Sequence, residues 1–128
     1  MDWNRIEHIM GVIKSYLLYS WRFGSWGRRS DINRPLKLNG SRNIHIGSHV
    51  FVGYKTWLAA VPHTGIEAKL VISDSCTIGN FNHIYATGRI TIESSVLTAD
   101  SVYISDNIHG YEDPAVPVKC QSIKQRGG

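Results

Sequence analysis

Aliphatic residues recur at every sixth position through the middle of the chain. The series runs Ile46, Val52, Leu58, then Ile72, Ile78, Ile84, then Ile92, Thr98, Ile104, and eight of its nine members are aliphatic. In most copies the following residue is small or acidic, with Tyr85 as the exception. An amphipathic helix would repeat about every 3.6 residues and an ordinary strand every second residue. A period of six is instead typical of a parallel β-helix, in which each hexapeptide forms one side of a triangular coil.

This period predicts an all-β domain over residues 38–128, with about three coils whose aliphatic residues point inward. From Ile46 to Ile72 the chain advances 26 residues, eight more than three hexapeptides need. We therefore expect a loop over residues 59–71 that leaves the coil, and a small bulge near Ala86–Arg89. The period stops after Asp106, and residues 107–128 are predicted to form a long loop outside the coils.

The segment before the repeats, residues 1–37, has a different pattern. Apolar residues recur there in steps of three and four, which predicts an amphipathic helix over residues 2–21 with Asp2 as a suitable N-cap. Charged residues interrupt the apolar run, so this helix is not predicted to span a membrane. It is expected to pack on the coils, to contact a membrane surface peripherally through residues 1–30 with Arg22, Arg28 and Arg29 near anionic lipid, or to do both.

The charge pattern supports this division of the chain. The net charge of the chain is +4. Residues 1–37 hold seven Lys or Arg against three acids and so carry all of it, whereas residues 38–128 are neutral. No recognisable nucleic-acid-binding motif accompanies the basic residues, so no nucleic-acid partner is predicted. Cys76 and Cys120 form neither a disulfide framework nor a metal clip. No secretory leader is visible, and we expect a cytoplasmic protein, placed at the inner face of the membrane if the helix binds lipid.

The repeats and the segment SDNIHGYEDP resemble the hexapeptide-repeat acyltransferases, over roughly residues 30–128. The closest subgroup is the sugar and polysaccharide O-acetyltransferases, which include the maltose, galactoside and nodulation-factor acetyltransferases. The resemblance implies a left-handed parallel β-helix and a homotrimer with each active site between two subunits. It also implies acetyl-CoA as the donor, a sugar or polysaccharide hydroxyl as the acceptor, and no metal.

Within this resemblance, His109 matches the family's catalytic histidine. A hydroxyl is a poor nucleophile at neutral pH, and an imidazole that removes its proton contributes about 10²–10⁴-fold to the rate. A backbone N–H can stabilise the oxyanion. Asp106 and Asn107 precede His109, where they would orient the imidazole, contact the acceptor, or only form local hydrogen bonds in a turn.

Asn82 is the second predicted contact with the acceptor. The galactoside-type enzymes carry Asn-Phe-Asn at the place of Asn80-Phe81-Asn82 and use the later Asn for acceptor hydroxyls; a turn or ladder role is the alternative. Those enzymes also use an acid several residues on, and the stretch IYATGRI has none. His83 and Tyr85 are further candidate substrate-binding residues, and Arg89 would suit a charged acceptor.

The sequence departs from the family in length. The family continues with further coils, which carry most of the groove for CoA, so cofactor-binding residues are expected mainly in coils absent from these 128 residues. We therefore expect this chain alone to be weakly active or inactive.

Two other functions remain open. A structural or assembly module is one, because an uncapped coil leaves unpaired strand edges that favour association. A zinc enzyme related to the γ-type carbonic anhydrases is the other, since six histidines are present and neutral histidine is a good zinc ligand. The histidine spacing of that family is not found here.

Overall fold

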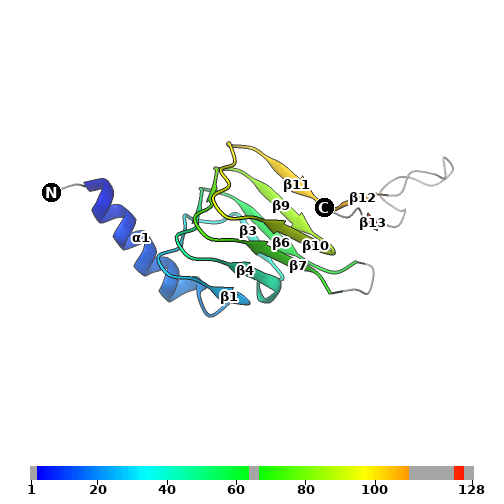
Figure 1. The fold of residues 1–128 in the computed structure, drawn as a ribbon, viewed down its shortest axis with the longest axis horizontal. Coiled ribbons are helices and arrows are strands. Elements are labelled where there is room, and N and C mark those ends of the chain that lie inside the picture. The colour runs from blue at the N-terminus through cyan, green and yellow to red at the C-terminus, as the bar shows by residue number, and fades with distance from the viewer. Residues whose placement is uncertain (1–2, 64–66, 110–122, 126–128) are drawn as a thin grey trace.

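The computed structural model describes residues 3–63, 67–109 and 123–125, and for 107–109 and 123–125 it describes the backbone alone. The chain begins with one helix, α1 (Trp3–Tyr19), as the apolar spacing predicted. Figure 1 shows α1 at one end of a stack of short strands, with its N-terminal turns reaching beyond the sheets.

Three parallel sheets make up the stack. The first contains β1 (Ser25–Trp26), β4 (Ile44–Ile46), β7 (Lys69–Ile72) and β10 (Arg89–Ile92). The second contains β2 (Asp31–Ile32), β5 (Phe51–Val52) and β8 (Thr77–Ile78). The third contains β3 (Lys37–Asn39), β6 (Trp57–Ala60), β9 (His83–Ala86) and β11 (Tyr103–Ser105). A short 3₁₀ helix, Ser41–Asn43, precedes β4.

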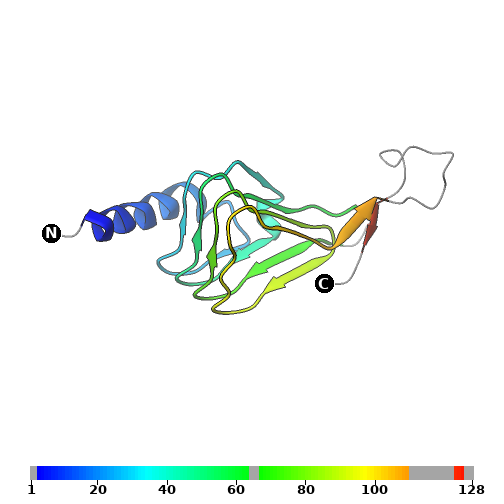
Figure 2. The same ribbon diagram turned by 90° about the horizontal axis from the view of Figure 1, so that it is seen from above.

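The chain visits the three sheets in turn and then returns to the first, one layer further along the stack (Figure 2). We call each passage through the three sheets a circuit. The sheets begin at Ser25, within the predicted N-terminal segment. Neighbouring circuits pair residue by residue, so that Leu38, Leu58, Ile84 and Ile104 form one row across the third sheet.

The core is a column of these rows. Seven of the nine residues spaced by six are buried, and only Thr98 and Ile104 are partly exposed. Aliphatic side chains stacked in register exclude water from one another, and this burial is the main stabilising term. The predicted burial of the six-spaced residues is thus confirmed for seven of them.

The predicted fold class is wrong. We expected an all-β, left-handed parallel β-helix, whereas the structure is an α/β fold of one helix and three parallel sheets of short strands. The period of six describes which residues are buried and where the chain bends, but it carries no information on helix content or hand. The pattern is also irregular in the structure, because around Leu97 the chain makes only an isolated bridge to Thr77.

Two corners of the circuit repeat the same backbone conformation. Positive φ angles of 51–64° recur in successive circuits at non-glycine residues, for instance at His49, Lys55, Ser75 and Ser95. The corners are tied together by side chains, because Asp74 Oδ1 accepts from the Ser48 N–H at 2.8 Å. A residue in this region lets the chain turn sharply, at some steric cost for any residue with a Cβ.

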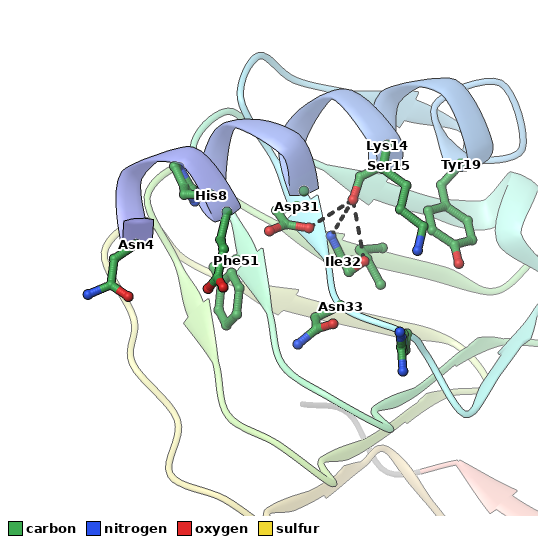
Figure 3. Close-up of a pocket in the computed structure, with 12 residues that line it drawn as sticks. Asn4, His8, Lys14, Ser15, Tyr19, Asp31, Ile32, Asn33 and Phe51 are labelled. Carbon is green, nitrogen blue, oxygen red and sulfur yellow. Dashed lines mark hydrogen bonds between the residues drawn. The ribbon is translucent and has the colours of Figure 1, made fainter. Parts of the chain in front are cut away.

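Helix α1 is attached to β2 by polar contacts (Figure 3). The Ser15 hydroxyl donates to Asp31 Oδ1 at 2.9 Å and accepts from the Ile32 N–H at 2.9 Å. Gly11 faces the same carboxylate, and a Cβ there would lie 2.5 Å from Asp31 Oδ2. Ser15 is the buried residue of the helix, and of its large apolar residues Tyr19, at its C-terminal end, packs against the core.

The predicted loop over residues 59–71 is shorter in the structure. β6 extends to Ala60 and β7 begins at Lys69, so residues 61–68 alone connect these strands, and 64–66 lie outside the described residues. The segment 107–128 begins with a strand, β12 (Asn107–His109), which pairs antiparallel with β13 (Ile123–Gln125). The rest of that segment, 110–122 and 126–128, lies outside the described residues.

Candidate functional site

A row of aromatic and cationic side chains lies on the outer face of the third sheet. Lys37, Trp57, His83 and Tyr103 are paired in register on β3, β6, β9 and β11. Each precedes a core residue by one position, and alternate residues of a strand point to opposite faces, so all four point outward. We call this row the aromatic ladder.

The members of the aromatic ladder contact one another along its length. Lys37 Nζ lies 4.9 Å from the centroid of the Trp57 ring. The His83 ring stacks on the indole at a centroid distance of 4.0 Å and an interplanar angle of 10°. The ring centroids of Tyr103 and His83 are 4.8 Å apart, and the two ring planes are inclined by 62°. Tyr103 is 62% exposed, so its ring offers a free surface at the end of the ladder.

A second contact reaches this face from the loop after β6. Tyr85 lies two residues after His83 on β9, so it shares the outer face. Its hydroxyl lies 2.8 Å from His63 Nε2, and the two rings are 5.9 Å apart. The Tyr85 ring also contacts the Trp57 ring edge-on, with 6.1 Å between the ring centroids. Two histidines and three large aromatic rings therefore gather on one surface.

The pKa of His83 is changed by its position on this surface. Burial disfavours the charged form of the imidazole, which lowers the pKa of His83 below its ordinary value. Its Nε2 atom is buried and has no hydrogen-bond partner among the described residues. A buried polar atom without a hydrogen-bond partner is energetically unfavourable, which marks His83 as a candidate functional residue.

Asp106 fixes the corner at which the chain leaves the third sheet. Its Oδ1 accepts from the Thr87 N–H at 2.8 Å and from the Thr87 hydroxyl at 3.0 Å, and its Oδ2 accepts from the Gly88 N–H at 2.9 Å. Burial alone would raise the pKa of Asp106. The hydrogen bonds from Thr87, Gly88 and the Arg89 backbone outweigh this and hold the pKa below its ordinary value. The carboxylate is therefore ionised and locks β11 to the turn after β9.

A basic cavity of about 450 Å³ lies on the other side of this corner. Gly88 and Arg89 line it together with Lys69 and His45. Lys69 and Arg89 are paired in register on β7 and β10, which places two like charges side by side. Burial, and then the charge of Lys69, lowers the pKa of His45. Like charges on neighbouring strands repel each other, and an anion between them would remove that cost.

The predicted site residues divide into three groups. His83 and Tyr85 are brought together on the aromatic ladder face. Asn82 points inward and is 1% exposed; its amide donates to the Asn80 and Ala99 carbonyls and accepts from the Thr98 hydroxyl. Asp106 is buried at the corner. Asn107 and His109 lie on the backbone of β12, and their side chains lie outside what the structure describes.

Sequence reasoning missed Trp57, Tyr103, Lys37 and His63. A signal for the first three was present, because each stands immediately before a member of the row Leu38, Leu58, Ile104. Aligning the residue before each aliphatic position would have placed them in one outward row with His83. His63 carries no such signal, since it belongs to the insertion, and only the fold brings it to Tyr85.

Within the described ranges, no group of three or more His, Cys, Asp or Glu side chains is arranged to hold a metal ion. In the same ranges no helix is long and apolar enough to cross a membrane. Comparison of the chain with protein-family models, with curated proteins and with solved structures found no match.

Proposed function

We propose that this protein is an acyltransferase that transfers the acetyl group of acetyl-CoA to a hydroxyl of a sugar or polysaccharide. One observation carries the proposal: Tyr85, on the same face as the aromatic ladder, and the basic cavity adjoin the same corner, held by Asp106, from which the chain continues to His109. Tyr85 lies just before that corner, and Gly88, which bonds Asp106, lines the cavity. The resemblance of the segment around His109 to the O-acetyltransferases supplies the reaction.

The acceptor sugar binds on the aromatic ladder face. The ring face of Tyr103 is exposed, and the apolar C–H face of a pyranose packs on an aromatic ring by dispersion and burial of apolar area. Tyr85 and His63 supply polar groups beside that ring. A few polar groups on a mostly apolar surface are what orients a small ligand.

His109 acts as the general base. The sugar oxygen attacks the thioester carbonyl carbon while the imidazole takes the hydroxyl proton. The tetrahedral intermediate then collapses, the C–S bond breaks, and the proton passes to the departing thiolate. The products are the acetyl ester of the sugar and free CoA thiol, so no oxidant or metal is consumed.

The basic cavity suits the phosphate groups of the donor. Lys69 and Arg89 present two cations there, and guanidinium and ammonium groups both bind phosphate. Glu67 also lines this cavity and limits its net charge. A donor held here would have its phosphates on one side of the Asp106 corner and the acceptor on the other.

The proposal includes a homotrimer in the cytoplasm. In a trimer the exposed outer face of the third sheet would adjoin a neighbouring subunit, which would enclose the acceptor site. Cys76 is a free, buried thiol, which suits a reducing compartment.

The test is a thiol-release assay with acetyl-CoA and a panel of mono- and oligosaccharides. We expect weak, acceptor-dependent release of CoA thiol that His109→Ala lowers further, by up to about 10²–10⁴-fold. Tyr103→Ala should raise KM for the sugar with a smaller effect on kcat, because it removes acceptor binding. His49→Asn is the matched control: His49 is exposed at a remote corner with φ 56°, and asparagine tolerates that conformation.

Two results would show the proposal wrong. One is the absence of acceptor-dependent thiol release with every sugar in the panel. The other is release that His109→Ala and His49→Asn affect equally, which would mean that His109 is not the base.

A further inference from the structure

The apolar face of α1 is exposed. Seven large apolar residues of the helix are exposed, and Trp3, Met10 and Leu17 are 75%, 64% and 66% exposed. They recur at seven-residue steps, so they share one side of the helix. Ser15 and Gly11, on another side, hold the helix to β2. An amphipathic helix normally turns its apolar stripe to the core, and here that stripe faces away from the sheets.

The apolar face continues into the corner that follows β1. A groove of about 380 Å³ lies between the helix residues Val12, Ile13, Tyr16 and Leu17 and the segment from Trp26 to Arg29. Arg28 and Arg29 line its far side, and both are exposed. Trp21 and Arg22, just after the helix, are exposed as well. Apolar and aromatic side chains are thus bordered by arginines.

From this arrangement we infer that α1 binds the surface of an anionic lipid bilayer. A helix with Trp and Leu on one face and basic residues at its border lies in the plane of the membrane, with the apolar face buried about 5–10 Å into the boundary between headgroups and acyl chains. The charge of the chain fits this partner, because its whole net charge of +4 is carried by residues 1–37. Lys and Arg side chains near an anionic membrane surface strengthen binding to it.

The alternative occupant of this face is a second copy of the chain. A symmetric pair would place the same patch of each copy against the other. The arginines at the border of the patch would then come together from both copies, and the second copy would bring no extra acidic residues to neutralise them. Repulsion between these like charges disfavours that arrangement. The same arginines are attracted by phosphate headgroups, so the charges favour lipid. In this orientation the polar attachment through Ser15 and Asp31 keeps the sheets on the aqueous side.

The experiment is vesicle flotation of the full chain. We expect the protein to float with phosphatidylcholine vesicles that contain phosphatidylglycerol, and much less with phosphatidylcholine alone. Raising the salt concentration should weaken binding, since screening shortens the reach of the arginine charges. The double variant Met10→Gln, Leu17→Gln should lower the bound fraction by at least about tenfold, because two exposed apolar anchors are lost.

Leu97→Gln is the matched control, since Leu97 is 76% exposed and belongs to the last circuit, far along the chain from α1. It should float like the unmodified protein. Arg28→Gln should reduce binding to anionic vesicles and leave binding to neutral ones unchanged. Circular dichroism of each variant confirms that α1 is still formed.

Three results would overturn the inference. The first is no flotation of the folded protein with either vesicle. The second is equal loss of flotation in Leu97→Gln and the double variant. The third is light scattering in which the double variant dissociates an oligomer while lipid binding is unchanged, which would assign the face to a second copy of the chain.

Discussion

At the scale of single residues, the Asp106 carboxylate holds the corner next to the candidate site. It accepts hydrogen bonds from Thr87 and Gly88 and is 1% exposed. Asp106→Asn removes the charge and turns one acceptor into a donor that faces the Gly88 N–H. A buried donor without a partner costs about 1–3 kcal/mol, so we expect a loss of that size in the free energy of unfolding at pH 7, measured by urea denaturation.

The same substitution should lose its effect in acid. The pKa of Asp106 is lowered in the folded protein from the ordinary value of 3.8, so its carboxylate stabilises the fold above that pH. The contribution falls away as the pH drops through the lower, folded-state pKa. Unmodified protein and Asp106→Asn should therefore converge in stability well below pH 3.8. Asp100→Asn, at an exposed acid that accepts from the Asn80 N–H, is the control and should cost less at pH 7.

His83 gives a second prediction at this scale. Burial lowers the pKa of the His83 imidazole from the ordinary value of 6.5, so the ring is neutral at and above pH 6.5. Stability should fall as the pH drops from the unfolded-state value to the lower, folded-state pKa, because the unfolded chain binds the proton more readily. NMR titration of the ring protons should show His83 with a midpoint below the ordinary value of 6.5. A midpoint at or above 6.5 would contradict the burial of His83.

At the scale of elements, the corners are where the backbone is under strain. Ser95 has φ 64°, whereas its neighbour Ser94 has an ordinary φ, and both are exposed. Glycine relieves the steric cost of a positive φ, which is about 1–2 kcal/mol, but adds disorder to the unfolded chain. Ser95→Gly should thus be neutral or stabilise by up to about 1 kcal/mol.

A branched side chain at the same corner should do the opposite. Ser95→Val places a β-branched residue at positive φ, which is a genuine outlier, and should destabilise by at least about 1 kcal/mol. The pair Ser94→Gly and Ser94→Val is the control. At Ser94 the glycine variant should not be more stable than the valine variant. Thermal unfolding of the four variants measures the effect, and the same order at both positions would contradict strain at Ser95.

The elements also show what the sequence was able to predict. The six-residue spacing identified Leu58, Ile72 and Ile84 as buried because burial depends on local pattern and stacking alone. The three- and four-residue spacing predicted α1, but not which of its sides meets the sheets. The side is decided by Ser15 and Asp31, 16 residues apart, whose hydrogen bond exists only in the folded chain.

The site was less predictable than the fold. His83 and Tyr85 were chosen from their neighbourhood in the chain, and the structure places them on one face. Asn82 was chosen because it breaks the repeat, yet its amide is satisfied inside the protein. A polar break in an apolar pattern reveals that a partner is needed, but not whether the partner is a ligand or, as here, a backbone carbonyl such as that of Ala99.

At the scale of the whole molecule, the core is a continuous column of buried side chains. Among the described residues, the last circuit of this column, which contains Ile104, is more exposed than the others. Ile84 and Ile104 are paired in register on β9 and β11. Ile84 is 0% exposed, because circuits pack on both of its sides, whereas Ile104 is half-buried. The two isoleucine side chains lie in one row, so their different exposure follows from their place along the column.

This difference predicts a gradient of stability along the stack. Ile84→Ala leaves a closed cavity and should cost about 2–5 kcal/mol in the free energy of unfolding. Ile104→Ala should cost less than half as much, because water and neighbouring side chains fill the space at the open end. Native-state hydrogen exchange should agree, with slower exchange in β6 and β9 than in β11, whose circuit has fewer buried contacts to hold it closed. Equal costs for the two alanine variants would mean that Ile104 is covered in solution, as a neighbouring subunit on this end of the column would cover it.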